Sequence, residues 1–296
     1  MARRSVRGLA ALLIALALTA CATEDGSPST TAPTTTTLPS TTTTAVPTTS
    51  STVPVPTSTT GDPFEEVDAE ITVPDGEGPF PAVVLLHGGG WVAGAPGLVA
   101  PLASHLTENE FLVVNTRYTL ASFDRAGFPD AVEDVACAVR YAATHPESDG
   151  TVAVIGHSAG AHLGALVSLV GDRYPGDCPF EGSGLPEKFV GLAGPYDVSR
   201  LGLAIAAFFG GAPDRVPDVW EAGNPMNFVG ENPDLEALIM YGELDGLVAD
   251  SFALGFHAAL LDAGAGSVVE LVEGARHNDM HDPDLVGDLI VTWLEK

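Results

Sequence analysis

The stretch VAVIGHSAGAHLG, residues 152–164, constrains the fold more than any other part of the chain. The apolar residues that end at Ile155 are typical of a buried strand, and the small residues after Ser158 have helical spacing. The strand therefore passes into the helix through a sharp turn, where the backbone is crowded. Gly156 and Gly160 have no side chain to clash in such a turn, and the side chain of Ser158 stands clear of the backbone.

Apolar strands alternate with helical stretches after residue 63, which predicts an α/β domain. We expect a mostly parallel central sheet with helices on both faces and a small cap region. Strands are expected at Ala82–Leu86, Phe111–Asn115, Thr151–Ile155, Phe189–Leu192, Ala237–Tyr241 and Val268–Val272, and helices at Pro129–His145, Ser251–Ala263 and Asp284–Leu294.

The first 62 residues have the composition of segments that do not fold. Residues 1–20 carry a basic start and a short apolar run, which predicts a secretory signal. The following Leu-Thr-Ala-Cys resembles a bacterial lipobox, which implies a lipid anchor on Cys21 and an exported, membrane-anchored lipoprotein. Residues 21–62 are rich in Thr, Ser and Pro and are expected to form a disordered stalk. Residues 63–296 remain as one domain.

The charge of the chain excludes some partners. With the signal removed, nine basic residues stand against 39 acidic ones, which gives a net charge of about −30. Nucleic acid and anionic membrane surfaces are repelled by such a protein, so the lipid is the only membrane contact expected. Cys137 and Cys178 remain for a disulfide in an oxidising compartment, although the sequence does not fix their distance. The oligomeric state stays open.

The position of Ser158 at the start of a helix is typical of a catalytic nucleophile. The N–H of the next residue, Ala159, has no partner within the helix and can donate to the oxyanion that forms when the serine attacks a carbonyl group. A glycine-rich turn with an idle serine is the alternative. His87-Gly88-Gly89-Gly90-Trp91 follows the strand Ala82–Leu86, and its bare amides suit the same oxyanion. A flexible turn or a phosphate cradle would also use glycines, but the Lys-Ser/Thr of a nucleotide loop is missing.

An acid and a histidine follow the last two predicted strands. Asp245 follows the fifth strand and His277 the sixth, so the chain order is serine, acid, histidine. His277 would take and return the proton of Ser158, and Asp245 would orient the imidazole. Glu243 is the rival acid and His281 the rival histidine. His87 and His157 are expected to have structural roles.

These motifs together resemble the α/β-hydrolase superfamily. The segments HGGGW (87–91), GHSAG (156–160), GELD (242–245) and GARH (274–277) look like its esterase/lipase branch, related to hormone-sensitive lipase and including feruloyl-esterase-like and kynurenine-formamidase-like members. The resemblance implies that Gly89 and Gly90 form the oxyanion hole with Ala159. It implies no cofactor, and the sequence contains no metal-binding constellation.

The expected function is a serine carboxylesterase that cleaves short-to-medium esters through an acyl-enzyme on Ser158. An arylformamidase or other amidase with the same triad is one alternative, and a non-catalytic cell-surface binding module is another. The apolar residues Ile205, Phe208, Phe209 and Trp220 either cap an acyl pocket or belong to the core, and Trp91 either packs under its loop or lines the pocket.

Overall fold

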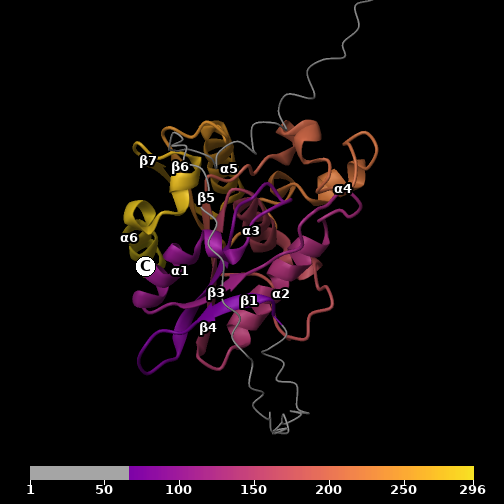
Figure 1. Cartoon of the computed structure of the whole chain (residues 1–296). Coiled ribbons are helices and arrows are strands. Elements are labelled where there is room, and N and C mark those ends of the chain that lie inside the picture. The colour runs from indigo at the N-terminus through magenta and orange to yellow at the C-terminus, as the bar shows by residue number, and fades with distance from the viewer. Residues whose placement is uncertain (1–66) are drawn as a thin grey trace, which may run out of the picture. The chain divides into compact units, whose positions relative to one another are not determined.

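The computed structural model describes residues 67–296, which form a seven-stranded sheet in the order β1-β3-β2-β4-β5-β6-β7 (Figure 1). The strands are β1 (Ala69–Thr72), β2 (Phe80–Leu86), β3 (Leu112–Thr116), β4 (Ser148–His157), β5 (Lys188–Leu192), β6 (Glu236–Gly242) and β7 (Gly266–Val272). Neighbouring strands are parallel except β1 and β3, which are antiparallel. The expectation of a mostly parallel sheet is confirmed.

Helices cover both faces of this sheet. The helices α2 (Asp130–Thr144), α3 (Ala159–Val170) and α5 (Asp250–Ala263) pack on one face, and α1 (Ala100–Glu108) and α6 (Pro283–Leu294) on the other (Figure 1). Successive residues of β2 alternate between the two layers, so Val84 joins one apolar cluster and Val83 the other. Strands buried on both faces need apolar runs, which explains the sequence of β2 and the first three residues of β3.

The edge strand β1 is absent from the sequence-based expectations. Its four residues alternate between half-buried and exposed positions and pair with only one neighbour, β3. So short an alternating segment carries little hydrophobic signal. The predicted strands and helices are present, with ends shifted by a few residues; β4, for example, begins at Ser148 rather than Thr151.

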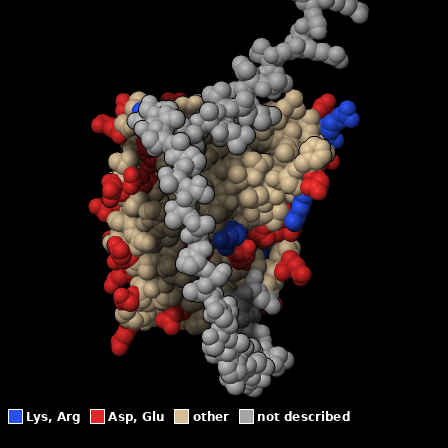
Figure 2. Space-filling model, in the orientation of Figure 1, with Lys and Arg blue, Asp and Glu red and all other residues tan. Residues whose placement is uncertain are grey.

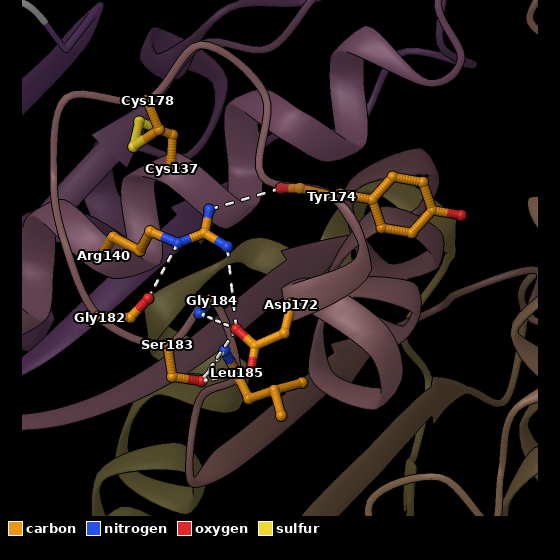
Figure 3. Close-up of polar contacts among 9 residues, drawn as sticks. All are labelled: Cys137, Arg140, Asp172, Tyr174, Cys178, Gly182, Ser183, Gly184 and Leu185. Atoms are coloured by element: carbon orange, nitrogen blue, oxygen red, sulfur yellow. Dashed lines mark hydrogen bonds and ion pairs between the residues drawn. A yellow bond between two sulfur atoms is a disulfide. The ribbon is translucent and has the colours of Figure 1, made fainter.

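The segment after α3 is fastened to α2 (Figure 3). A disulfide joins Cys137 of α2 to Cys178. The guanidinium of Arg140, one helical turn further on, donates to the carbonyl oxygens of Gly182 and Tyr174 and lies 3.8 Å from a carboxylate oxygen of Asp172. Because Arg140 is almost fully buried, these partners compensate for the loss of its hydration.

The segment between β5 and β6 contains short 3-10 turns and the helix α4 (Pro217–Ala222). The four apolar residues whose role the sequence left open are buried here and belong to the core: Ile205, Phe208, Phe209 and Trp220. The predicted signal, stalk and Cys21 lie outside the described residues. Within residues 67–296 no helix has the length and apolar character needed to cross a membrane.

Candidate active site

Ser158 lies at the turn between β4 and α3, in a backbone conformation that disfavours most residues. Its φ is +54° and its ψ is −115°. The flanking glycines permit this turn, because a Cβ on Gly160 would lie 2.6 Å from the carbonyl oxygen of His87 and one on Gly156 would lie 2.6 Å from the amide nitrogen of Ala161. The crowded turn expected from the sequence is therefore present, and the side chain of Ser158 is partly exposed.

The structure brings Ser158, His277 and Asp245 into one hydrogen-bonded chain. The Nε2 atom of His277 lies 2.9 Å from the Oγ of Ser158, and its Nδ1 atom lies 2.8 Å from a carboxylate oxygen of Asp245. The other carboxylate oxygen of Asp245 accepts from the amides of Leu247 and Val248. The Asp245 side chain is only 3% exposed, so its orientation is fixed by these contacts.

The rival residues have other partners. Glu243 accepts a hydrogen bond from the amide of Gly274, which braces the loop that carries His277. The ring of His281 lies against His157, with ring centroids 4.8 Å apart. Of the two acids and two histidines, Asp245 and His277 are the pair that the structure joins to Ser158.

His157 forms a hydrogen bond with the backbone of His277. Its Nε2–H donates to the carbonyl oxygen of His277 at 2.9 Å. Burial, followed by the nearby charge of His277, lowers the pKa of His157 to about 3. A neutral His157 keeps this donor, so the position of His277 depends on a residue that the sequence identified only as structural.

The loop His87–Trp91 lies directly beside the serine. A Cβ on Gly88 would lie 3.2 Å from the Cβ of Ser158. Gly89 and Gly90 have φ values of +133° and +61°, and the amides of Val92 and Ala93 fold back onto the carbonyl oxygen of Gly89. Among residues 67–296, no hydrogen bond uses the N–H of Gly89, Gly90 or Ala159. These amides are therefore free to bind an oxygen anion.

His87 and Trp91 anchor the two ends of this loop. The Nδ1–H of His87 donates to the carbonyl oxygen of Gly88, and Tyr118 stacks on the imidazole and donates its hydroxyl to the His87 carbonyl. Trp91 is 4% exposed and belongs to the apolar core, as expected if it packs under the loop. Its indole nitrogen contacts His162, a residue that sequence reasoning did not connect to the site.

A separate groove of about 570 Å³ lies at the β1 and β3 edge of the sheet and includes none of the triad residues. Arg117, Asp130 and Cys137 are among the residues that line it. Within the described part of the chain, no group of three or more His, Cys, Asp or Glu side chains is arranged to hold a metal ion.

Residues 70–260 match the family model BD-FAE. A probable isoprenylcysteine alpha-carbonyl methylesterase of Arabidopsis thaliana is 24% identical, over 69% of this chain and 46% of its own length. Esterase LipC of Mycobacterium tuberculosis is 26% identical, over 67% of this chain and 55% of its own length. The chain thus spans about half the length of these curated relatives.

Solved structures of esterases are also similar. A carbohydrate esterase from gut microbiota matches with a TM-score of 0.67 at 21% identity, over 76% of this chain and 89% of that one. The butyrate-bound esterase Est2 of Thermogutta terrifontis matches with a TM-score of 0.63 at 21% identity, over 77% of this chain and 86% of that one. At these identities the likeness shows a shared fold.

Proposed function

The chain belongs to the BD-FAE family, and from this premise we propose that it is a serine carboxylesterase whose acyl-enzyme forms on Ser158. The observation that carries the proposal is the pair of contacts made by His277, 2.9 Å to Ser158 and 2.8 Å to Asp245. A nucleophile, a base and an orienting acid at these distances form the arrangement used for acyl transfer.

In the first half-reaction, the Oγ of Ser158 attacks the ester carbonyl carbon while His277 takes the hydroxyl proton on Nε2. Asp245 stabilises the resulting imidazolium through Nδ1–H. The N–H groups of Gly89, Gly90 and Ala159 would donate to the oxyanion. The bond from carbon to the alcohol oxygen then breaks, and His277 returns its proton to that oxygen. The acyl group remains on Ser158.

In the second half-reaction, His277 takes a proton from water, and the water oxygen attacks the acyl-enzyme. The tetrahedral intermediate collapses, the proton returns to Ser158, and a carboxylic acid leaves. We propose short-to-medium acyl groups, since solved structures of the Thermogutta terrifontis esterase hold butyrate and propionate.

The test is hydrolysis of p-nitrophenyl acetate, butyrate and octanoate by the wild type, by Ser158→Ala and by Ser122→Ala. Ser122 is an exposed serine that binds Asp124, so its variant serves as the control. We expect Ser158→Ala to lose turnover and Ser122→Ala to retain it. Equal turnover in the two variants would refute the acyl-enzyme. Turnover of formanilide with none of the esters would favour the amidase alternative.

We further propose that the protein is an exported lipoprotein anchored through Cys21. The Cys137–Cys178 disulfide supports this, because such bonds persist in oxidising compartments. Cells that express the full chain should show a lipid-labelled product in the membrane fraction, and Cys21→Ser should abolish the label. An unlabelled wild type would refute the anchor.

A further inference from the structure

Trp91, the last residue of the glycine loop, holds a backbone conformation that is costly for an aromatic residue. Its φ is +62°, next to Gly90 at +61°. Glycine adopts a positive φ freely, whereas a bulky residue in this region is strained. The conformation persists only where surrounding contacts hold it.

The side chain of Trp91 is where those contacts are made. Its Nε1–H donates to the Nδ1 atom of His162 at 3.1 Å, and its ring packs against the rings of His162 and Phe208. Its carbonyl oxygen accepts from the amide of Ala121. Trp91 is therefore fixed through both its backbone and its side chain.

The other ring nitrogen of His162 is bound as well. Its Nε2 atom lies 2.8 Å from the carbonyl oxygen of Gly223. A carbonyl only accepts, so Nε2 carries the proton and Nδ1 is left to accept from the indole. His162 is fully buried, and burial lowers its pKa to about 4, so the neutral imidazole keeps this tautomer near neutral pH.

His162 lies on α3, four residues and about one helical turn after Ser158. One side chain thus joins the helix of the nucleophile, the loop of the proposed oxyanion donors and the segment at Gly223. We propose that His162 is a positioning residue that sets the amides of Gly89 and Gly90 relative to Ser158 by fixing Trp91. The inference rests on the proposed esterase function and assigns His162 no contact with substrate.

Two substitutions at position 162 separate the two hydrogen bonds. In His162→Asn, the amide oxygen takes the place of Nδ1 and can accept from Trp91. In His162→Gln, the amide nitrogen takes the place of Nε2 and can donate to Gly223. Each variant leaves one of the two partners of His162 without its hydrogen bond, the Gly223 carbonyl in His162→Asn and the Trp91 indole in His162→Gln. The two variants should therefore show a similar fall in the urea midpoint.

Their activities should differ. Misplacing oxyanion donors by about 1 Å costs on the order of 100-fold in rate. We expect His162→Gln and Trp91→Phe, which both break the indole bond, to lower kcat about 10- to 100-fold with KM within about threefold. His162→Asn should keep kcat within about threefold of the wild type.

Inhibitors give a second measurement. A trifluoromethyl ketone forms an oxyanion on the serine, whereas the matching methyl ketone binds largely without one. We expect His162→Gln to weaken the fluorinated inhibitor by the same factor as kcat/KM and to leave the methyl ketone unchanged. Equal effects on both ketones, or equal kcat in the two position-162 variants, would overturn the inference.

The indole bond can be measured without any reaction. The chain has three tryptophans, so an ¹⁵N spectrum should contain three indole signals, and loss of one in Trp91→Phe assigns it. This signal should resist hydrogen exchange in the wild type and in His162→Asn, and exchange faster in His162→Gln. Fast exchange in the wild type would overturn the inference. A wild type with a protected indole and no ester turnover would instead refute the proposed esterase function.

Discussion

At the scale of single residues, the site depends on two backbones held against their preferences. Ser158 and Trp91 both have positive φ, at +54° and +62°. Small neighbours make room for Ser158, and the His162 bond and ring packing hold Trp91. Substitution of the small residues next to Ser158 and Trp91 by larger ones should therefore be poorly tolerated.

Gly160→Ala tests this at the serine. Its Cβ would lie 2.6 and 2.7 Å from the carbonyl oxygens of His87 and Leu86, so the turn must shift. We expect the free energy of unfolding to fall by about 1–3 kcal/mol and most of the ester turnover to be lost.

The matched control is Gly255→Ala in α5, where a Cβ meets nothing within 4 Å. It should stabilise the protein by about 0.4–1 kcal/mol and leave kcat unchanged. Equal losses in both would contradict the steric argument.

Asp245→Asn tests which acid orients His277. An amide nitrogen facing Nδ1 favours the wrong tautomer, and such a change costs on the order of 10⁴-fold in kcat in a serine protease triad. We expect a loss of at least 1,000-fold here. Glu243→Gln still offers an oxygen to the amide of Gly274 and should lose less than about threefold. The reverse order of losses in p-nitrophenyl butyrate assays would reassign the acid.

The buried histidines predict how stability depends on pH. Burial holds the pKa of His157 at about 3 and that of His162 at about 4, below the ordinary 6.5. Between these values and 6.5 the unfolded chain binds protons that the folded one does not, so the free energy of unfolding falls as the pH falls through this window. Once the folded histidine also binds its proton, its contribution to the slope ends.

Urea unfolding between pH 4.5 and 7 measures this slope. His162→Asn removes one titrating group, so its free energy of unfolding should vary less with pH than that of the wild type. Parallel curves for the two proteins would show that folding does not lower the pKa of His162. Other titrating groups act equally in both and cancel in the comparison.

The proposed triad of Ser158, Asp245 and His277 was predictable from sequence because each member follows a strand within a recognisable short motif, and the structure places the three in contact. The supporting contacts were not. The bond from His157 joins residues 120 apart in the chain, and that from Trp91 joins residues 71 apart, so only the fold brings them together. The sequence placed His157 in the turn beside Ser158 and His162 in the following helix, without showing what either would bind.

At the scale of elements, hydrophobic pattern predicted the buried strands well and missed β1. β2 is a continuous apolar run and β3 begins with one, whereas β1 contains only Ala69 and Ile71 as apolar residues. The disulfide was left open for a related reason, because no local pattern sets the distance between Cys137 and Cys178.

Reduction of the disulfide should destabilise the protein. The bond closes a loop with a sequence separation of 41, for which loop entropy gives about 4 kcal/mol. We expect dithiothreitol to lower the urea midpoint of the wild type. The double variant Cys137→Ala/Cys178→Ala should start near the lower midpoint and not respond to reductant. An unchanged wild-type midpoint after confirmed reduction would contradict the prediction.

At the scale of the whole molecule, charge is strongly one-sided, with 39 acidic and 12 basic residues. In Figure 2, acidic side chains gather along the left margin, on the side where Figure 1 places β7 and α6, and few basic side chains are visible. Mutual repulsion of like charges opposes the compact state, and dissolved salt screens it.

We therefore expect Tm to rise by several degrees between about 20 mM and 0.5 M sodium chloride. Choline chloride should have the same effect if screening is the cause, and sucrose of equal osmolality serves as the uncharged control. A Tm that is flat or falls in both salts would show that repulsion contributes little.

The parts of the site that carry Ser158 and His277 should differ in thermal stability, because they follow strands at different positions in the sheet. Ser158 follows β4, which has a strand on each side, whereas His277 follows β7, which in the described chain pairs with β6 alone. Outer strands open more readily than inner ones. On heating, His277 should therefore lose its position before the strands around Ser158 unfold. A variant designed to keep its hydrolytic activity longer should therefore be stabilised first at β7 and at the contacts of that strand.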